Sequence, residues 1–188
     1  VEIMQNVRKY WWIAIVLLLV LLPWGGFNTL VALDEEINGA WAQVENQLQR
    51  RFDLIPNLVE TVKGYTTHEQ EVLGAIAEAR TRYAGAGSVG EKAVAAGELD
   101  SALSRLMLIV ENYPQLKADT QFTRLQDELA GTENRIAVAR MRYNEQVKSY
   151  NAKIRRVPYA IYASLFDFSI RDYFQAAPGA DQVPQVKF

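Results

Sequence analysis

The stretch RRFDLIPNLVETVKGY, residues 50–65, places a proline inside what otherwise reads as one amphipathic helix. A proline in a helix interior removes one backbone hydrogen bond and costs about 3 kcal/mol. Two conformations accommodate Pro56: Asp53 could cap a new helix, or one helix could continue with a bend. Apolar side chains keep a single helical register across the proline: Leu48, Phe52, Ile55, Val59 and Val62. We therefore predict a continuous helix that bends near Phe52.

The same apolar spacing of three and four residues extends this helix from Asn28, a candidate N-cap, to about Thr66. Three more helices are predicted over about 68–83, 91–112 and 117–156. Thr66 or Thr67 is predicted to cap the second helix. The Gly-rich stretch at residues 84–90 matches G-x-G-x-x-G, but no strand precedes it, so we interpret it as a flexible connection. Nothing between Asn28 and Arg156 reads as a strand.

We therefore predict an all-α protein: a single N-terminal transmembrane helix, followed by an elongated antiparallel bundle with coiled-coil-like packing. The bundle would have about four helices, two of them long. The predicted domains are an anchor at residues 1–27, the bundle at 28–157, and an aromatic segment with an extended tail at 158–188.

The anchor is predicted from WWIAIVLLLVLLPWGGF, 17 residues at positions 11–27 without a charged side chain. With its flanking residues this run spans a hydrocarbon core of about 30 Å as a helix. The residues expected to anchor it in the membrane are Trp11, Trp12, Leu18, Leu22 and Trp24. A cleaved signal peptide is the alternative, but no A-x-A pattern follows. Arg8 and Lys9 precede the run, which predicts a cytoplasmic N-terminus. We expect a single-pass protein of the bacterial inner membrane with its bundle on the periplasmic or outer side.

Composition removes several classes of function. The chain has 20 basic and 22 acidic residues and no basic block, so we expect no nucleic-acid partner. It has no cysteine, which excludes a thiolate zinc site, and His68 is its single histidine, which excludes a metal cluster built from several histidines. A carboxylate pair such as Glu60 and Glu111 could bind a metal, but a solvated face or ion pairs with Arg50, Arg51 and Arg135 is the favoured interpretation. No cofactor, metal or catalytic residue is predicted.

Tyrosine and asparagine recur with a seven-residue spacing near the end of the last long helix. Tyr143 and Asn144 are followed by Tyr150 and Asn151, and Asn134 lies on a nearby track. Amide side chains at this spacing either form a structural polar layer that fixes the register between helices, or line a ligand site.

Alternating helices would bring DLIPN and ENYP close together at the end of the bundle far from the membrane. The residues in these two motifs that we consider candidates for a partner or structural site are Asp53, Pro56, Asn57, Glu111, Asn112, Tyr113 and Pro114. The aromatic residues of positions 159–174 would lie near the bilayer, where they cover the bundle or contact headgroups or a neighbouring subunit.

Three stretches resemble the LemA family of bacterial membrane proteins: RRFDLIPNLVETVKGYTTHE, then ENYPQLKADTQFTRLQDELAGTENRIAVARMRYNEQVKSYN, and the closing PQVKF. The resemblance implies an N-terminal membrane helix followed by a helical bundle. It implies no established enzymatic activity. Relatives include a magnetosome-membrane protein, and family genes often neighbour a membrane-bound zinc protease of the heat-shock type.

We therefore expect a non-enzymatic, membrane-anchored scaffold or adaptor that self-assembles in membrane organisation or envelope quality control. Its expected partners are membrane lipid, further copies of itself, and a membrane protein such as a membrane protease. The alternative is an envelope sensor that binds a lipid, a cell-wall fragment or a small ligand through polar residues between its helices.

Overall fold

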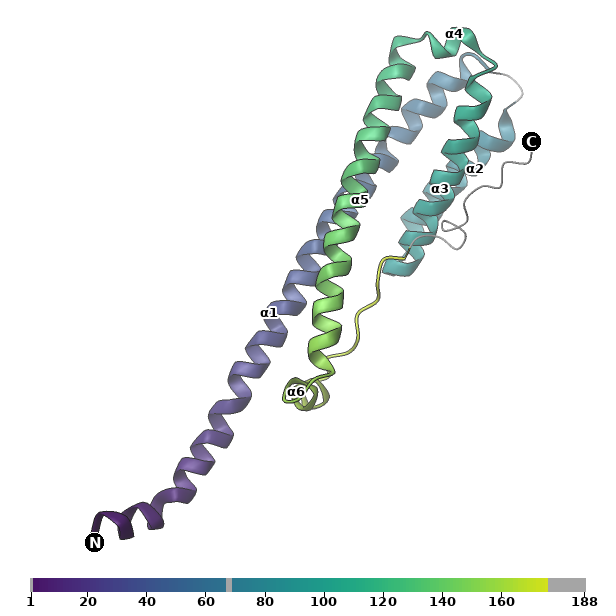
Figure 1. The fold of residues 1–188 in the computed structure, drawn as a ribbon. Helices are drawn as coiled ribbons and strands as arrows, with labels where there is room; N and C mark the ends of the chain where they lie inside the picture. Colours follow the sequence, from purple (N-terminus) through teal and green to yellow (C-terminus); the bar gives the residue numbers. More distant parts are fainter. Residues whose placement is uncertain (1, 67–68, 176–188) are drawn as a thin grey trace, which may run out of the picture. The chain divides into compact units, whose positions relative to one another are not determined.

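A computed structural model describes the backbone of residues 2–66 and 69–175 and the side chains of residues 25–66 and 69–175. These residues form helices and connections, and none of them lies in a strand, which confirms the all-α prediction (Figure 1). The helices are α1 (Glu2–Lys63), α2 (Gln70–Gly85), α3 (Val89–Val110), α4 (Pro114–Lys117), α5 (Thr120–Ile154) and α6 (Tyr159–Leu165).

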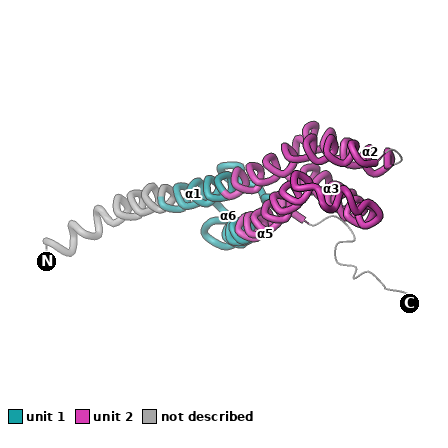
Figure 2. Tube along the Cα trace, turned by 90° about the horizontal axis from the view of Figure 1, so that it is seen from above, with its two compact units in different colours: residues 1–39, 145–171 teal, residues 40–144, 172–188 magenta. Residues whose placement is uncertain are grey.

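The chain divides into two compact units (Figure 2). Unit 1 comprises residues 1–39 and 145–171, and unit 2 comprises residues 40–144 and 172–188. Helices α1 and α5 each contribute to both units, whereas α2, α3 and α4 belong to unit 2 and α6 belongs to unit 1.

Helix α1 passes through Pro56 without a break, as the continuous apolar stripe predicted. Ile55, Leu58 and Val62 are buried on either side of the proline, so core packing compensates for the lost backbone hydrogen bond. The bend near Phe52 stays a prediction.

The predicted helix start at Asn28 is wrong, because Asn28 lies inside α1. Neither Gly25 nor Gly26 adopts the positive φ of a C-cap, and the Thr29 hydroxyl donates to the Gly25 carbonyl at 2.8 Å within the helix. Each glycine costs only about 1 kcal/mol relative to alanine, which is less than the loss of a helical turn with its hydrogen bonds.

The predicted anchor residues Trp11, Trp12, Leu18, Leu22 and Trp24 lie outside the residues whose side chains are described. Across residues 25–66 and 69–175, no helix combines the length and the apolar character needed to cross a membrane. The transmembrane segment therefore stays a prediction from the sequence.

Unit 2 places its core between the second half of α1, the α2–α3 hairpin and the first two-thirds of α5. The largest buried side chains of this core include Phe52, Leu58, Ile76, Leu99, Leu106, Phe122 and Ile136. The rings of Phe52 and Tyr83 stack with centroids 4.2 Å apart, which joins α1 to α2. The helices α2 and α3 lie side by side in both ribbon and tube views (Figures 1 and 2).

Two helix starts in unit 2 differ from their predicted positions. Ser88 and Glu91 form a reciprocal capping box, so α3 begins at Val89 instead of Glu91. Thr66 does not cap α2, because its hydroxyl donates back to the Val62 carbonyl at 3.2 Å. Thr67 and His68 lie outside the described residues.

The predicted helix of residues 117–156 is divided near its start. Pro114 opens the short helix α4, where a proline loses no helical hydrogen bond. Asp119 then accepts a hydrogen bond from the Phe122 amide at 2.9 Å, and α5 begins at Thr120. The carboxylate of Asp119 thus satisfies one of the amides left free at the new helix start.

Unit 1 packs residues 25–39 of α1 against the end of α5 and against α6. Its buried side chains include Leu30, Ile37, Val147, Tyr150, Ile154 and Tyr162. Gly26 allows α6 to approach α1 closely, because a Cβ there would overlap the Tyr162 ring and lie 2.9 Å from its Cζ. After α6 the chain turns at Asp167, whose φ is 58°, and continues without regular structure to residue 175.

Candidate functional site

Asn151 holds the backbone of Arg171 within unit 1. The buried Asn151 side chain on α5 donates from Nδ2 to the Arg171 carbonyl at 2.8 Å, and its Oδ1 accepts from the Arg171 amide at 2.9 Å. The amide side chain therefore pairs with one residue as a neighbouring peptide group would. The Arg171 guanidinium also forms a two-pronged pair with Asp34 on α1, at 2.9 and 2.7 Å.

Asn144 makes the equivalent pair within unit 2, with Phe174. Its Nδ2 donates to the Phe174 carbonyl at 3.0 Å, and its Oδ1 accepts from the Phe174 amide at 2.9 Å. The Phe174 ring is buried, with the Arg140 guanidinium 4.7 Å from its centroid and the Trp41 ring 6.1 Å away. The adjacent Tyr143 hydroxyl donates to the Asp172 carbonyl at 2.8 Å.

The spacing of these two asparagine clamps explains the Tyr-Asn repeat. Seven helical residues rise about 10.5 Å, and three extended residues span about 10 Å. Because the two distances match, two asparagines seven residues apart on a helix can bind two residues that are three apart in an extended segment. Tyr143 and Tyr150 are themselves buried, and burial followed by the nearby Asp34 charge raises the pKa of Tyr150.

These contacts correct the structural interpretation of the repeat. It predicted that Asn144 and Asn151 would fix the register between helices, whereas they bind the backbone of the C-terminal segment. Sequence reasoning missed this because the partner groups at Arg171 and Phe174 belong to the main chain, and main-chain partners leave no pattern of residue types.

Asn134 lies apart from the clamps, in an open groove between α1 and α5 of unit 2. The groove has a volume of about 430 Å³. It is lined by Gln43, Asn46, Gln47, Asn134, Arg135, Val138, Ala139 and Arg142. The Oε1 atom of Gln47 is buried and has no hydrogen-bond partner among the described residues. Arg135 and Arg142 are exposed and lie two helical turns apart on α5.

The motifs predicted to meet at the distal end are held by other partners. Asp53 accepts from Gln49 at 2.8 Å, Glu111 pairs with Lys117 at 2.7 Å, and the Asn57 carbonyl accepts from a threonine one turn later. Among the described residues, no hydrogen bond or ion pair joins DLIPN to ENYP. Pro56 is half-buried, and Asn112 and Pro114 are exposed.

Two tyrosine–carboxylate hydrogen bonds hold together the connections at this end of unit 2. The Tyr113 hydroxyl donates to Glu69 at 3.0 Å, and the Tyr65 hydroxyl donates to Asp119 at 2.7 Å. Each bond favours the protonated phenol beside a carboxylate and raises the tyrosine pKa. Hydrogen bonds from the Phe122 amide and from Tyr65 lower the pKa of Asp119.

An ion cluster joins three helices in the middle of unit 2. Arg51 on α1 is buried, lies 2.6 Å from Asp100 on α3, and bonds Glu133 on α5. Burial raises the pKa of Asp100, and the Arg51 charge opposes that shift. Arg51 thus forms ion pairs, but not with the predicted partners, because Glu60 and Glu111 pair instead with Lys63 and Lys117, their neighbours along the chain.

A second charged contact lies beside it. Lys92 on α3 pairs with Glu45 on α1, and its ammonium lies 5.8 Å from the Trp41 ring centroid and 5.7 Å from that of Tyr83. Burial, followed by the nearby carboxylates, raises the pKa of Tyr83 to about 12, so its phenol stays neutral. Over the described residues, no three acidic or histidine side chains are arranged to hold a metal ion.

Comparison with known proteins places this chain among relatives. The family model described as the LemA family matches residues 40–188. Magnetosome proteins MamQ 1 and MamQ 2 of Paramagnetospirillum magneticum are each 28% identical to it over 181 residues, covering 82% of this chain and 66% of the relative. Protein LemA of Metamycoplasma hominis is 26% identical over 131 residues, covering 69% of this chain and 60% of that protein. The chain thus spans slightly less than two-thirds of these relatives.

Proposed function

The chain belongs to the LemA family, and from this premise we propose that it is a non-enzymatic, membrane-anchored scaffold or adaptor that assembles with copies of itself. The process it serves would be membrane organisation or quality control in the cell envelope. Its MamQ relatives are named magnetosome proteins, which supports the first of these.

The observation that carries this proposal is that the recurrent polar side chains bind groups of the chain itself. The amides of Asn144 and Asn151 are occupied by the chain's own backbone. The buried Arg51 is occupied by Asp100 and Glu133. Within each unit these polar side chains thus hold helices and the C-terminal segment in place, and this structural use supports a scaffold.

Membrane anchoring is supported by the apolar run at positions 11–27 and by the continuity of α1. The proposed location is the bacterial inner membrane, crossed once, with the N-terminus in the cytoplasm and the folded units on the periplasmic or outer side.

Self-assembly is supported by large apolar side chains that unit 2 leaves exposed, among them Val94 on α3 and Met141 on α5. Anchoring confines all copies to one surface, which raises their effective concentration for weak lateral contacts. Membrane lipid, further copies of the chain and a membrane protein such as a membrane protease are the proposed partners.

Crosslinking in the native membrane tests the proposal. The chain has no cysteine, so a single Met141→Cys variant carries one defined attachment point for a short crosslinker, and Arg124→Cys provides an exposed polar control on the same helix. We expect the Met141 variant to give crosslinks to a second copy or to one membrane protein, identified by mass spectrometry. Equal, unselective crosslinking from both positions would refute a specific assembly surface.

The groove beside Asn134 favours a second candidate function, an envelope sensor. Its two guanidinium groups and the unpartnered Gln47 Oε1 suit a small ligand that carries both an anionic group and hydrogen-bond donors, such as a cell-wall fragment. Titration with soluble muropeptides, monitored by the amide exchange of α5, tests it. Binding that is lost in Arg135→Gln and unaffected in Arg124→Gln would support the sensor, and absence of binding would refute it.

A further inference from the structure

Unit 1 exposes a concentrated set of large apolar side chains around α6. These residues, which we term the α6 patch, are Val157, Ile161, Leu165, Phe166 and Ile170, and each is 49–79% exposed. They fall within one short segment that includes the two ends of α6. Contiguous exposed apolar side chains on a soluble surface mark a contact with a partner or a membrane.

The α6 patch lies beside the end of the apolar run in α1. Phe27 is the last residue of that run, and its ring lies 4.8 Å from Phe166 and 5.8 Å from Phe168 by centroid distance. Gly26 admits the Tyr162 ring against the α1 backbone. At a rise of about 1.5 Å per residue, the predicted interfacial Trp24 is only about 4.5 Å further along the helix axis. Helix α6 is therefore level with the proposed membrane boundary.

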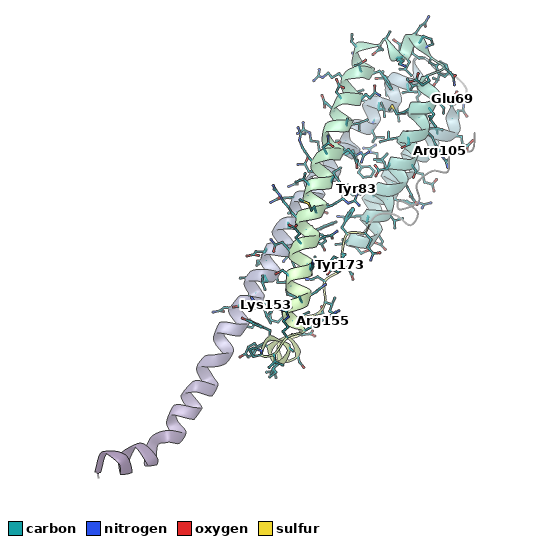
Figure 3. The ribbon with its side chains drawn as sticks, in the orientation of Figure 1. Glu69, Tyr83, Arg105, Lys153, Arg155 and Tyr173 are labelled. Atoms are coloured by element: carbon teal, nitrogen blue, oxygen red, sulfur yellow. The ribbon has the colours of Figure 1, made fainter. Side chains whose placement is uncertain are left out.

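Basic side chains stand next to the patch. Arg155 and Arg156, in the turn between α5 and α6, are exposed and form no ion pair among the described residues, and the Lys153 ammonium lies 5.0 Å from the Tyr159 ring centroid. Figure 3 shows Lys153 and Arg155 close to α6. On α1, Asp34 pairs with Arg171, the residue that directly follows the patch segment. Asp167 is the acid inside the patch segment itself.

We propose that the α6 patch lies in the interface of an anionic lipid bilayer, with its apolar side chains among the acyl chains and with Arg155 and Arg156 at the phosphate groups. This inference rests on the proposed membrane anchoring and extends it: the protein contacts the bilayer twice, through the predicted span and through α6. Apolar side chains beside basic ones form the composition that binds such an interface. Continuity with α1 and the sign of the charges favour lipid over a second copy of the chain.

Site-directed fluorescence on the full chain in vesicles tests the inference. Leu165→Cys is labelled with an environment-sensitive dye, and Leu108→Cys is the matched control, because Leu165 and Leu108 are 71% and 74% exposed. The vesicles contain phosphatidylcholine with or without phosphatidylglycerol, and a fraction of the lipids carries a nitroxide near the headgroup end of the acyl chain. We expect a blue shift and several-fold stronger lipid quenching for the Leu165 dye than for the Leu108 dye.

A double variant tests the proposed contact of Arg155 and Arg156 with the lipid phosphate groups. Arg155→Gln with Arg156→Gln is expected to lower the ratio of docked to undocked α6 in phosphatidylglycerol vesicles by about fivefold for each residue. Neutral vesicles should show little change. An equal effect in both vesicle types would overturn the electrostatic part.

The possible outcomes separate the inference from the proposed function. If the protein floats with vesicles while the Leu165 dye stays as exposed to water as the Leu108 dye, the α6 inference is wrong and anchoring stands. Protection from an aqueous quencher without lipid quenching would assign the patch to a second copy and also overturn the inference. If the protein fails to float with any vesicle, both the anchoring and the inference are refuted.

Discussion

Replacing Asn151 by alanine should release the backbone of Arg171 from α5. The substitution removes two hydrogen bonds, from Asn151 Nδ2 to the Arg171 carbonyl and from the Arg171 amide to Asn151 Oδ1. At a net 0.5–1.5 kcal/mol each, their loss amounts to about 1–3 kcal/mol. That free energy corresponds to a factor of about 5–150 in the local opening equilibrium. The Asp34 ion pair with the Arg171 side chain remains in place, so the substitution removes only the backbone contacts of Arg171 with Asn151.

Hydrogen exchange of individual amides measures this opening directly, because the Arg171 amide can exchange only when its bond to Asn151 is broken. We expect exchange at Arg171 to accelerate by about 5–150-fold in Asn151→Ala. Asn144→Ala should produce the same effect at Phe174. Asn134→Ala is the matched control, since Asn134 is an exposed asparagine of the same helix without a hydrogen bond among the described residues.

Two results would refute this reasoning. Unchanged exchange at Arg171 in Asn151→Ala would show that the clamp does not hold the segment. Equal acceleration in Asn134→Ala would show that any loss of an amide from α5 loosens the segment, regardless of contact.

Three further predictions concern stability, each measured by urea unfolding of the solubilised chain. Gly26→Ala should lower the free energy of unfolding by about 1–3 kcal/mol, because the added methyl group is overpacked against Tyr162. Gly25→Ala has open space at its Cβ and should raise the free energy of unfolding by up to about 1 kcal/mol. A change of the same sign in both variants would contradict the close approach of α6. Arg51→Met should lower the free energy of unfolding by about 1–3 kcal/mol, which is less than for a fully buried pair because the two carboxylate partners of Arg51 are partly exposed. An unchanged urea midpoint would exclude a role for the ion cluster in stability. Hydrogen bonds from two backbone amides lower the pKa of Glu91 from 4.5, so the stability that its carboxylate contributes is present above about pH 4.5 and is lost as pH falls through the lowered pKa. The difference in unfolding free energy between wild type and Glu91→Gln should therefore shrink on acidification. A difference independent of pH would be evidence against the capping box.

The regular part of the fold could be predicted because it depends on local periodicity. The stripe through Pro56 kept its register, and the structure shows one helix there. The Ser88–Glu91 capping box was also present in the sequence as S-x-x-E, and with it the start of α3 could have been placed correctly.

The candidate site could be predicted only in part, because its partners are distant along the chain. The Tyr-Asn repeat was visible, but Asn151 and Arg171 are 20 residues apart and Asn144 and Phe174 are 30 apart, and the partner groups are main-chain atoms. Arg51 lies three residues after Leu48 and four before Ile55, so the apolar stripe already places it on the buried face of α1. Its partners Asp100 and Glu133 lie on other helices, so the local pattern could not identify them.

The mass of the protein solubilised from its native membrane tests the central claim most directly. A self-assembling scaffold should give particles of two or more copies of the 21.3 kDa chain, with a fraction that rises with protein concentration and falls on dilution. A strict monomer at every concentration, with no partner protein attached, would contradict the scaffold account.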